Sequence, residues 1–535
     1  MKKRLKAPAL LLTLSMTAAI GLSACGNNNN NASPSASPST SPTASESNSP
    51  SASSSEPAKT ELQPFEVSIY MPGSPQKDQV VVEERIDELL KDKLPNTKVS
   101  LNYIDWSAYL EKTNLMLQSG EPLDLVFAPE WYQFFSNAAK GAFLPLNDDS
   151  LAQGNLLAQY GKGISETINP SYLQAPVIAG KLYAIPTNKE LAQGRGFAFR
   201  KDIVEKYNFD ISTVKDLKDI EPFLQVIKEK EPNIYPVYSN KQDSVLDWLQ
   251  DYGYQQLGFG TYINRTVEGS KVISMTSPEY LAIELANDKL LNDWYKKGYL
   301  NKNAPTTQEK IDDIKSAGKI WFISTTTSPG REEALRIKNN SGSGPENFDW
   351  SIVNTQAPLV TTSQATGSQF AIARSSKDPA RAMMVLDLLY TDKELLNTVV
   401  FGIQDKHYTK VGDNKIKQIA DSGYAPGNAW IIGNQLNNYL LDNESDSKYE
   451  EYVEFNKTAE QSPLLGFSFN PDPVKTQVAS YNTIFTEFSD ILRTGPVDPV
   501  DILKKRNDKL DKAGIGKIVE EMQKQLDEWK VANGK

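Results

Sequence analysis

The chain has 535 residues, enough for a large core and for roughly two to four domains. Hydrophobic residues make up 39% of it and charged residues 23%, a balance typical of a soluble globular protein. Acidic residues outnumber basic ones by 67 to 57, and the formal net charge is −10 at pH 7. This acidic balance argues against nucleic acid and against an anionic membrane surface as partners.

The counts of cysteine and histidine exclude several kinds of site. A single cysteine, Cys25, rules out an internal disulfide bond and a thiolate metal cluster. A single histidine, His407, rules out a multi-histidine zinc site, and no nucleophile motif lies near it to complete a Ser-His-Asp triad. A hydrogen-bonding role suits His407 better. We expect no metal and no cofactor, but 67 acidic residues leave room for a glycosidase pair of carboxylates.

Residues 1–24 have the layout of a secretory signal peptide. A start rich in lysine and arginine is followed by an apolar stretch and then by small residues. Residues 22–25, Leu-Ser-Ala-Cys, resemble a bacterial lipobox, which implies that Cys25 is lipidated and becomes the mature N-terminus. A free thiol or an ordinary signal peptide is the alternative. No later apolar run is long enough to span a bilayer, so the lipid would be the membrane anchor.

Residues 25–64 hold the anchor and a linker rich in Asn, Ser, Pro, Ala and Thr. Such a segment has too few large apolar side chains to offset the entropy lost on ordering, so we expect it to be disordered. A flexible chain of this length reaches about 35 Å on average. The linker would hold a folded body at the membrane, or carry it through the cell wall.

The folded part begins with alternating strands and helices. Alternation predicts strands over residues 65–70 and 99–103, and helical spacing predicts helices over residues 81–94 and 107–119. The apolar run at residues 123–127 suits a buried strand. This order is typical of a parallel α/β sheet, in which ligands bind beyond the carboxyl ends of the strands.

Further along, several segments recur in an order that resembles a known family, the extracellular solute-binding proteins of ABC importers in the maltose-binding-like group. The resemblance covers roughly residues 65–391, and the order of its segments is more specific than any one of them. The segments are residues 121–131, 140–146, 180–186, 199–202, 317–323 and 375–382.

The tail has a resemblance of its own. Residues 402–408, 433–435, 462–469 and 523–529 are similar to a subgroup of Gram-positive lipoproteins that have a C-terminal domain of unassigned role and are associated with carbohydrate uptake. Asp498 and Pro499 predict the start of a helix. The last helix has an apolar stripe, formed by Ile518, Val519, Met522, Leu526 and Trp529, which we interpret as core.

The resemblance implies an α/β fold of two lobes, the type II periplasmic-binding-protein-like fold, with hinge crossovers and extra C-terminal helices. We place the crossings near Pro186, near Thr362 and at residues 423–426. The first lobe would then comprise residues 65–185 and 363–422. The second lobe would comprise residues 186–362 and 423–535, including the C-terminal extension.

A sugar site needs aromatic faces for the sugar rings and fixed polar groups for the hydroxyls. Glu130, Trp131 and Tyr132 supply both directly after a buried strand, although a tryptophan is also a common core residue. Tyr70 and Ser74 follow the first strand and are further candidates.

The other candidates follow the crossings or belong to the second lobe. Asn188, Glu190 and Arg195 come after Pro186, where a solvated loop is the rival interpretation. Trp248 could instead be a core residue of a helix. Thr325 lies where the family places ligand contacts, but this chain lacks the aromatic residue that the family often has there. Trp430, with Asn434 and Gln435, is a better source of stacking.

These inferences favour a non-enzymatic, lipid-anchored receptor that captures a carbohydrate, an oligosaccharide by preference, and delivers it to the permease subunits of an ABC importer. It would act as a monomer on the outer face of a Gram-positive cell membrane. The alternatives are a cell-surface glycoside hydrolase and a ligand sensor without transport.

Overall fold

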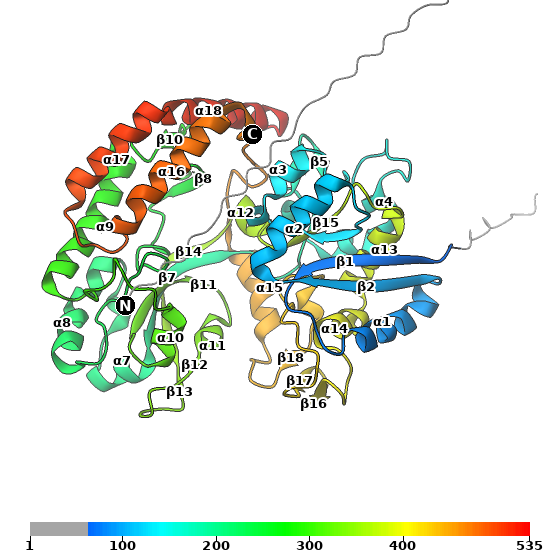
Figure 1. Cartoon of the computed structure of the whole chain (residues 1–535), viewed down its shortest axis with the longest axis horizontal. Helices are drawn as coiled ribbons and strands as arrows, with labels where there is room; N and C mark the ends of the chain where they lie inside the picture. The colour runs from blue at the N-terminus through cyan, green and yellow to red at the C-terminus, as the bar shows by residue number, and fades with distance from the viewer. Residues whose placement is uncertain (1–61) are drawn as a thin grey trace, which may run out of the picture. The chain divides into compact units, whose positions relative to one another are not determined.

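The computed structural model describes residues 62–535. The expected signal peptide, Cys25 and nearly all of the linker therefore lie outside the described residues. Within the described residues, two separate β-sheets define two lobes, and strands β7 and β14 extend from the second lobe toward the first (Figure 1).

The first lobe is built on a five-stranded sheet in the order β2-β1-β3-β15-β6. Strands β1 (Phe65–Pro72), β2 (Thr97–Ile104) and β3 (Leu125–Phe127) are parallel, as the sequence predicts. Strands β15 (Gln369–Ile372) and β6 (Ile185–Pro186) complete the sheet in antiparallel pairings. The carboxyl end of β3 therefore leads directly into the loop that holds Glu130 and Trp131.

Local sequence signals set the helices between these strands. Helix α1 (Gln79–Lys93) buries Val82, Ile86 and Leu90. Helix α2 (Trp106–Ser119) begins at Asp105, whose carboxylate accepts a hydrogen bond from the Ser107 backbone N–H, and ends at Gly120 in a left-handed conformation. These helices give the lobe its predicted β-α-β-α-β order.

The return segment completes the core of the first lobe. Helix α13 (Pro379–Thr391) is capped by Asp378 and begins with a proline, and it buries an almost continuous apolar surface. Helix α14 (Lys393–Phe401) packs against α13 and α1. Other short elements of this lobe are η1 (Glu130–Tyr132), α3 (Phe134–Ala139), α4 (Leu156–Tyr160), α5 (Lys162–Thr167), α6 (Pro170–Leu173), β4 (Val177–Ile178) and β5 (Lys181–Leu182).

The second lobe is built on a sheet in the order β11-β7-β14-β19. Strand β7 (Gln193–Arg200) lies between β11 (Phe322–Thr327) and β14 (Trp350–Val360), antiparallel to both. Its inner face carries Phe197 and Phe199, which pack with Trp321 and Trp294 in a fully buried cluster. The surrounding elements are α7 (Lys201–Tyr207), η2 (Ile211–Thr213), η3 (Leu217–Ile220), α8 (Glu221–Lys230), α9 (Pro278–Lys297), α10 (Ile311–Ser316), α11 (Arg331–Leu335), β12 (Ile337–Lys338) and β13 (Asn347–Phe348).

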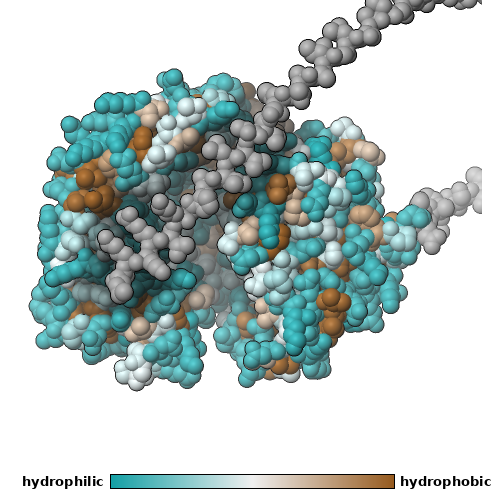
Figure 2. All heavy atoms as spheres, viewed as in Figure 1, coloured by the Kyte–Doolittle hydropathy of each residue, from teal (hydrophilic) through white to brown (hydrophobic). Residues whose placement is uncertain are grey.

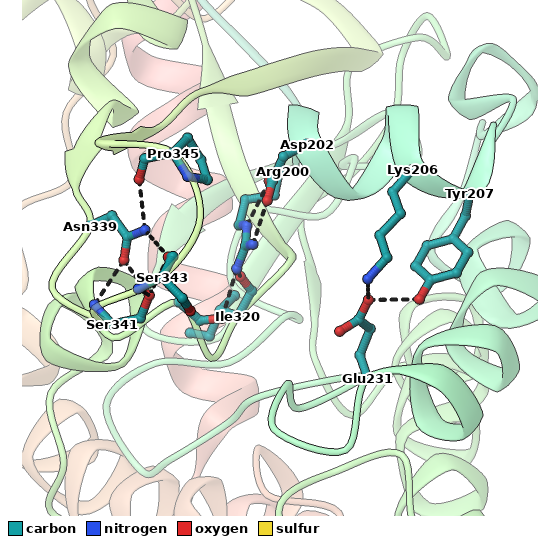
Figure 3. Close-up of polar contacts among 11 residues, drawn as sticks. Arg200, Asp202, Lys206, Tyr207, Glu231, Ile320, Asn339, Ser341, Ser343 and Pro345 are labelled. Atoms are coloured by element: carbon teal, nitrogen blue, oxygen red, sulfur yellow. Dashed lines mark hydrogen bonds and ion pairs between the residues drawn. The ribbon is translucent and has the colours of Figure 1, made fainter.

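Polar contacts hold the outer part of this lobe together (Figure 3). At the end of β7, the Arg200 guanidinium donates two hydrogen bonds to the Asp202 carboxylate, at 2.9 and 2.7 Å, and lies 4.0 Å above the Phe348 ring. Nearby, the Glu231 carboxylate accepts hydrogen bonds from Lys206 and from the Tyr207 hydroxyl. These side chains form hydrogen bonds with one another, and we interpret their role as structural.

The third crossing lies further along the chain than the sequence suggested. Tyr424, Ile431 and Ile432 are buried in the core of the first lobe, so the predicted crossing at residues 423–426 is wrong. The chain stays with that lobe through β16 (Tyr408–Lys410), β17 (Lys415–Gln418), η4 (Gln435–Asn437), β18 (Leu440–Leu441) and α15 (Lys448–Thr458), and it joins the second sheet only at β19 (Glu460–Gln461). The cause is physical: the apolar side chains after Pro426 fill the first lobe's core.

The C-terminal segment forms a helical layer on the second lobe (Figure 1). Helices α16 (Lys475–Leu492), α17 (Pro499–Ala513) and α18 (Ile515–Ala532) follow the short η5 (Asp472–Val474). Helix α17 packs on α9, and α18 packs on β9 (Thr261–Asn264) and β10 (Ile273–Ser274), the neighbours of β8 (Tyr254–Gly258). The predicted apolar stripe of the last helix is core, because Ile518, Met522 and Leu526 are fully buried.

The visible surface is largely hydrophilic, with hydrophobic residues in separate small patches (Figure 2). Among residues 62–535, no helix combines the length and the apolar character that a membrane span requires.

Candidate ligand-binding cleft

A cleft of about 1550 Å³ lies between the two lobes and the C-terminal helices. The first lobe contributes Glu130, Trp131 and Trp430, and the second lobe contributes Arg195 and Trp248. The segments that join the sheets also line it, including Gln193, Gln356, Leu359, Thr361 and Gln364. A ligand in this cleft would therefore contact both lobes and the connections between them.

The first-lobe wall carries two tryptophans, Trp131 and Trp430, and a third, Trp106, packs on both of them. Trp131 follows β3 on η1 and is 49% exposed, and its indole N–H donates a 2.8 Å hydrogen bond to the Gly367 carbonyl oxygen. The ring of Trp106 is nearly parallel to that of Trp131, at 6.3 Å and 15°, and to that of Trp430, at 5.9 Å and 9°. The hydrogen bond and the ring packing fix the indoles while leaving apolar surface open to the cleft, which suits stacking against sugar rings.

Glu130 provides a polar group beside Trp131. Its carboxylate accepts a hydrogen bond from the Thr366 hydroxyl at 3.3 Å, and its backbone N–H donates to the Thr366 carbonyl oxygen. Burial raises the pKa of Glu130, while hydrogen bonds from Ser363 and Thr366 oppose the shift. The group is thus held in one orientation and ready to exchange hydrogen bonds with a ligand.

In the second lobe, ion pairs hold the segment that carries Trp248. Trp248 is 43% exposed and lines the cleft. The neighbouring Asp247 is paired with Arg493, with an N–O distance of 2.5 Å, and Arg493 also donates to the Gln242 carbonyl oxygen. The Arg195 guanidinium donates to the Leu249 carbonyl oxygen at 2.8 Å. These contacts orient an otherwise irregular stretch of chain.

Asp251 anchors the next part of the wall. Its carboxylate is paired with Arg265 at 2.7 Å and accepts a hydrogen bond from the Gln356 side chain at 3.1 Å. Because Gln356 belongs to β14, this contact fastens the loop that holds Asp251 to the sheet of the second lobe.

The remaining wall combines α9 with the C-terminal helices. Arg506 of α17 forms a bidentate ion pair with Glu284 of α9, at 2.5 and 2.6 Å, and is only 2% exposed. One turn along α9, Asp288 is 5% exposed, and its Oδ2 atom has no hydrogen-bond partner among residues 62–535. The Tyr280 ring stacks on Tyr262 at 3.7 Å. Aromatic faces and fixed polar groups therefore occur at this wall as well.

The structure brings six of the sequence-predicted site residues to the cleft. They come from four separate segments of the chain, and they are Glu130, Trp131, Glu190, Arg195, Trp248 and Trp430. Glu190 is paired with its neighbour Lys189 at 2.7 Å.

The other candidates lie outside the lining, each for a visible reason. The side chain of Asn188 donates to Asn434 at 2.9 Å, so this buried pair fastens a crossing segment to the first lobe, and Gln435 is buried beside it. Thr325 is buried and accepts hydrogen bonds from Arg331, which itself lines the cleft.

Tyr70, Ser74 and Tyr132 serve the first lobe. Tyr70 packs against the cluster beneath β3, and its carbonyl oxygen accepts a hydrogen bond from the Tyr109 hydroxyl. Tyr132 stacks on Tyr109 at 5.2 Å, behind Trp131. Ser74 is exposed, and its carbonyl oxygen accepts a hydrogen bond from Gln76.

Several important residues were missed. Trp106 packs on two lining tryptophans and lies two residues after the end of β2, so the strand-end rule that selected Trp131 would have found it. No such strand-end signal marks the lining residues of the long amphipathic helices, because each is a single position on its helix. These residues are Tyr280, Glu284, Asp288 and Arg506. Among residues 62–535, no cluster of three or more His, Cys, Asp or Glu side chains could hold a metal ion.

Comparison with known proteins agrees with this architecture. Residues 75–395 match the family described as bacterial extracellular solute-binding protein, and residues 463–531 match a domain of unknown function, DUF3502. A curated relative from Streptococcus pneumoniae serotype 4 (strain ATCC BAA-334 / TIGR4), named as a carbohydrate ABC transporter substrate-binding protein, is 28% identical over 473 residues. That match covers 83% of this chain and 88% of the relative.

Solved structures show the same likeness. The N-glycan transport solute binding protein NgtS from Streptococcus pneumoniae is 26% identical, with a TM-score of 0.75, and the match covers 88% of this chain and 100% of that one. Its complex with Man5GlcNAc is 25% identical with a TM-score of 0.64, over 88% of this chain and 100% of that one. Its complex with Man1GlcNAc is also 25% identical, with a TM-score of 0.66, over 86% of this chain and 99% of that one.

The fold and the family inferred from the sequence are thereby confirmed. The chain belongs to the bacterial extracellular solute-binding proteins, with the two-lobe type II fold of that family and a DUF3502 domain at its C-terminal end.

Proposed function

We propose that this protein captures an oligosaccharide in the cleft between its lobes and delivers it to the permease subunits of an ABC importer, without chemically changing it. The observation that carries this proposal is the composition of the cleft. Half-exposed tryptophans from both lobes, Trp131 and Trp248, line the same space as hydrogen-bonded carboxyl, amide and guanidinium groups. That combination suits sugar rings, which have apolar faces and hydroxyl edges.

The size of the cleft supports an oligosaccharide. Its volume of about 1550 Å³ exceeds the range of about 300–1,000 Å³ that is usual for small-molecule pockets. The names of the related proteins support the same class, because one is a carbohydrate substrate-binding protein and NgtS has been solved with two mannose-containing glycans.

Delivery requires that an importer recognise the loaded protein. Because the ligand would contact both lobes, it would favour the conformation in which the lobes are closed on it, and this shift in population would mark the loaded state. We further propose that the protein works as a monomer on the outer face of the cell membrane, held there by a lipid on Cys25.

The anchor has a direct test. Replacing Cys25 with serine removes the thiol that would carry the lipid, so Cys25→Ser should appear in the medium or remain unprocessed. Glycan binding should be unchanged. Recovery of a processed Cys25→Ser protein in the membrane fraction would contradict lipid anchoring.

The function itself is tested by a glycan panel that includes Man1GlcNAc and Man5GlcNAc. A ligand at about 100 times its dissociation constant adds about 2.7 kcal/mol to the free energy of unfolding, so a bound glycan should raise the melting temperature measurably. Each glycan is then recovered and analysed for cleavage. Absence of any shift across the panel would contradict the proposal, and turnover would identify a glycoside hydrolase instead.

A further inference from the structure

The DUF3502 domain does more than cover the second lobe, because several of its residues line the cleft. Phe469 precedes α16, Phe485 and Ser489 lie on α16, and Arg506 lies on α17. Helices α16 and α17 pack on each other, and α17 packs on α9, whose side chains form the adjoining wall (Figure 1). We call this part of the cleft the C-terminal pocket, defined by Tyr280, Glu284, Asp288, Phe485 and Arg506.

Within the described part of the chain, the charged residues of the C-terminal pocket are hydrogen-bonded to protein groups, except for Asp288. Arg506 uses all its nitrogens within the protein: it forms the bidentate pair with Glu284 and also donates to the Asn507 side chain, at 3.0 and 3.1 Å. Asp288 differs, since it is 95% buried at the cleft wall while its Oδ2 has no partner among residues 62–535. An unsatisfied buried polar group costs stability, and a ligand that supplies the missing hydrogen bond is one reason for a protein to retain such a group.

The state of Asp288 indicates what it can bind. Burial, together with the nearby Glu284 carboxylate, raises the pKa of Asp288 to about 8, although Arg506 opposes the shift. The group is therefore mostly protonated at neutral pH, and a carboxylic acid can both donate and accept a hydrogen bond. A sugar hydroxyl, which also does both, is a matching partner.

Aromatic rings supply the rest of the pocket. Tyr280 stacks on Tyr262, and Phe485 stacks on Tyr481 at 5.6 Å, so flat apolar surfaces line the same cleft as the Asp288 carboxyl group. An anionic sugar would be disfavoured here, because Arg506 is already paired with Glu284 and an added negative charge would be buried without a cationic partner.

We propose that the C-terminal pocket is a subsite for a neutral, hydroxyl-bearing sugar residue of a longer glycan, with Asp288 as its hydrogen-bonding group. In this arrangement Arg506 is a positioning residue, which holds Glu284 and α9 in place. The DUF3502 domain thus selects for glycan length. This inference rests on the proposed function, since it assigns one part of the same cleft.

The test compares a short and a long glycan on substituted proteins. Calorimetric titrations of the full chain use Man1GlcNAc and Man5GlcNAc with wild type, Asp288→Leu and Asp288→Asn. The leucine removes all hydrogen bonding and should weaken Man5GlcNAc binding about tenfold or more. We expect Man1GlcNAc to occupy the tryptophan wall alone, so it should bind as it does to wild type. Asparagine still donates and accepts hydrogen bonds, so Asp288→Asn should restore most of the affinity.

The control is Asp293→Leu, an exposed acidic residue on the same helix and outside the cleft lining, which should bind both glycans as wild type does. Melting curves establish that each variant is folded; loss of an unpaired buried carboxyl should not unfold the protein. If Asp288→Leu binds Man5GlcNAc as tightly as wild type, or loses both glycans equally, the subsite is refuted while the proposed function stands. If wild type binds neither these two glycans nor any other of the panel, the proposed function fails as well.

Discussion

At the scale of single residues, the exposure of Trp131 separates a binding role from a packing role. Half of its surface is open to the cleft, whereas Trp294 and Trp321 of the second lobe are fully buried. Its hydrogen bond to Gly367 fixes the ring without burying it. The position thus allows ligand contact and contributes little to the core.

We therefore predict that Trp131→Ala weakens glycan binding by about 2 kcal/mol or more, or roughly thirtyfold, because a stacking anchor is lost. The melting temperature should change little. Calorimetry and thermal unfolding on the same variant measure both quantities. Trp294→Ala is the matched control: Trp294 is fully buried in the core of the second lobe and lies outside the cleft lining, so its removal should cost stability and leave the affinity of the folded protein unchanged. A Trp131→Ala protein destabilised by about 3–5 kcal/mol but with normal affinity would mark Trp131 as core.

Asp288 leads to a prediction about pH. Burial, together with the nearby Glu284 carboxylate, raises the pKa of Asp288 to about 8 in the folded protein, against an ordinary value of 3.8, although Arg506 opposes the shift. The folded state therefore binds the proton more tightly than the unfolded state, and this group makes the protein less stable as pH rises from about 4 to about 8. Asp288→Asn cannot ionise, so its stability relative to wild type should increase across that window. A difference that stays constant from pH 4 to pH 8 would show that Asp288 ionises normally.

The single histidine has the hydrogen-bonding role that the sequence favoured. His407 is 1% exposed, and its Nδ1 accepts a hydrogen bond from the Ile403 backbone N–H at 2.8 Å. Burial lowers the pKa of His407. It lies in the first lobe, outside the cleft lining.

At the scale of elements, the pairing of β7 with β14 leaves no room for a side chain at Gly196. Gly196 of β7 pairs with Asn354 of β14, and the carbonyl oxygen of the preceding Val353 would lie 2.0 Å from a Cβ atom added at residue 196. The contact is with backbone, so it could be relieved only by separating the two strands.

Gly196→Ala should therefore destabilise the protein severely, by several kcal/mol, comparable with overpacking of a core. Gly516→Ala is the control. It lies on α18, where an added Cβ atom meets no other atom within 4 Å, and alanine favours a helix by about 0.5–1 kcal/mol. Denaturant unfolding of both variants measures the contrast, and equal effects of the two substitutions would contradict the close strand packing.

Elements of the first lobe were predictable because their signals are local. Alternation in β1 and β2, the cap at Asp105 and the stop at Gly120 each act within a few residues, and the chain order of these elements gave the parallel sheet. The lobe membership of residues after Pro426 was not predictable, since glycine and proline mark a loop but do not say which core the following Ile431 and Ile432 will fill.

The candidate site shows the same division. Trp131 and Trp430 were found from strand ends and aromatic character, whereas Asn188 and Asn434 have the right chemistry but satisfy each other. Asp288 and Arg506 meet only through the packing of α9 against α17, which joins segments that lie far apart in the chain. No sequence pattern within either helix predicts such a contact.

At the scale of the whole molecule, the account depends on a ligand that touches both lobes. The cleft takes Trp131 from one lobe, Trp248 from the other and Phe485 from the C-terminal helices, while the chain crosses between the sheets after β6, after β14 and at β19. Such an arrangement allows the lobes to approach each other around a glycan, because the crossings are few and the ligand contacts form fully only when the lobes are close.

Small-angle X-ray scattering tests this claim most directly. The full chain is measured alone and with saturating Man5GlcNAc, or with the tightest glycan of the panel, after calorimetry has confirmed binding. Trp131→Ala under the same glycan concentration serves as a control for partial occupancy. The account predicts a smaller radius of gyration for the wild-type protein with glycan than without it. An unchanged scattering curve at confirmed saturation would contradict capture by closure of the two lobes.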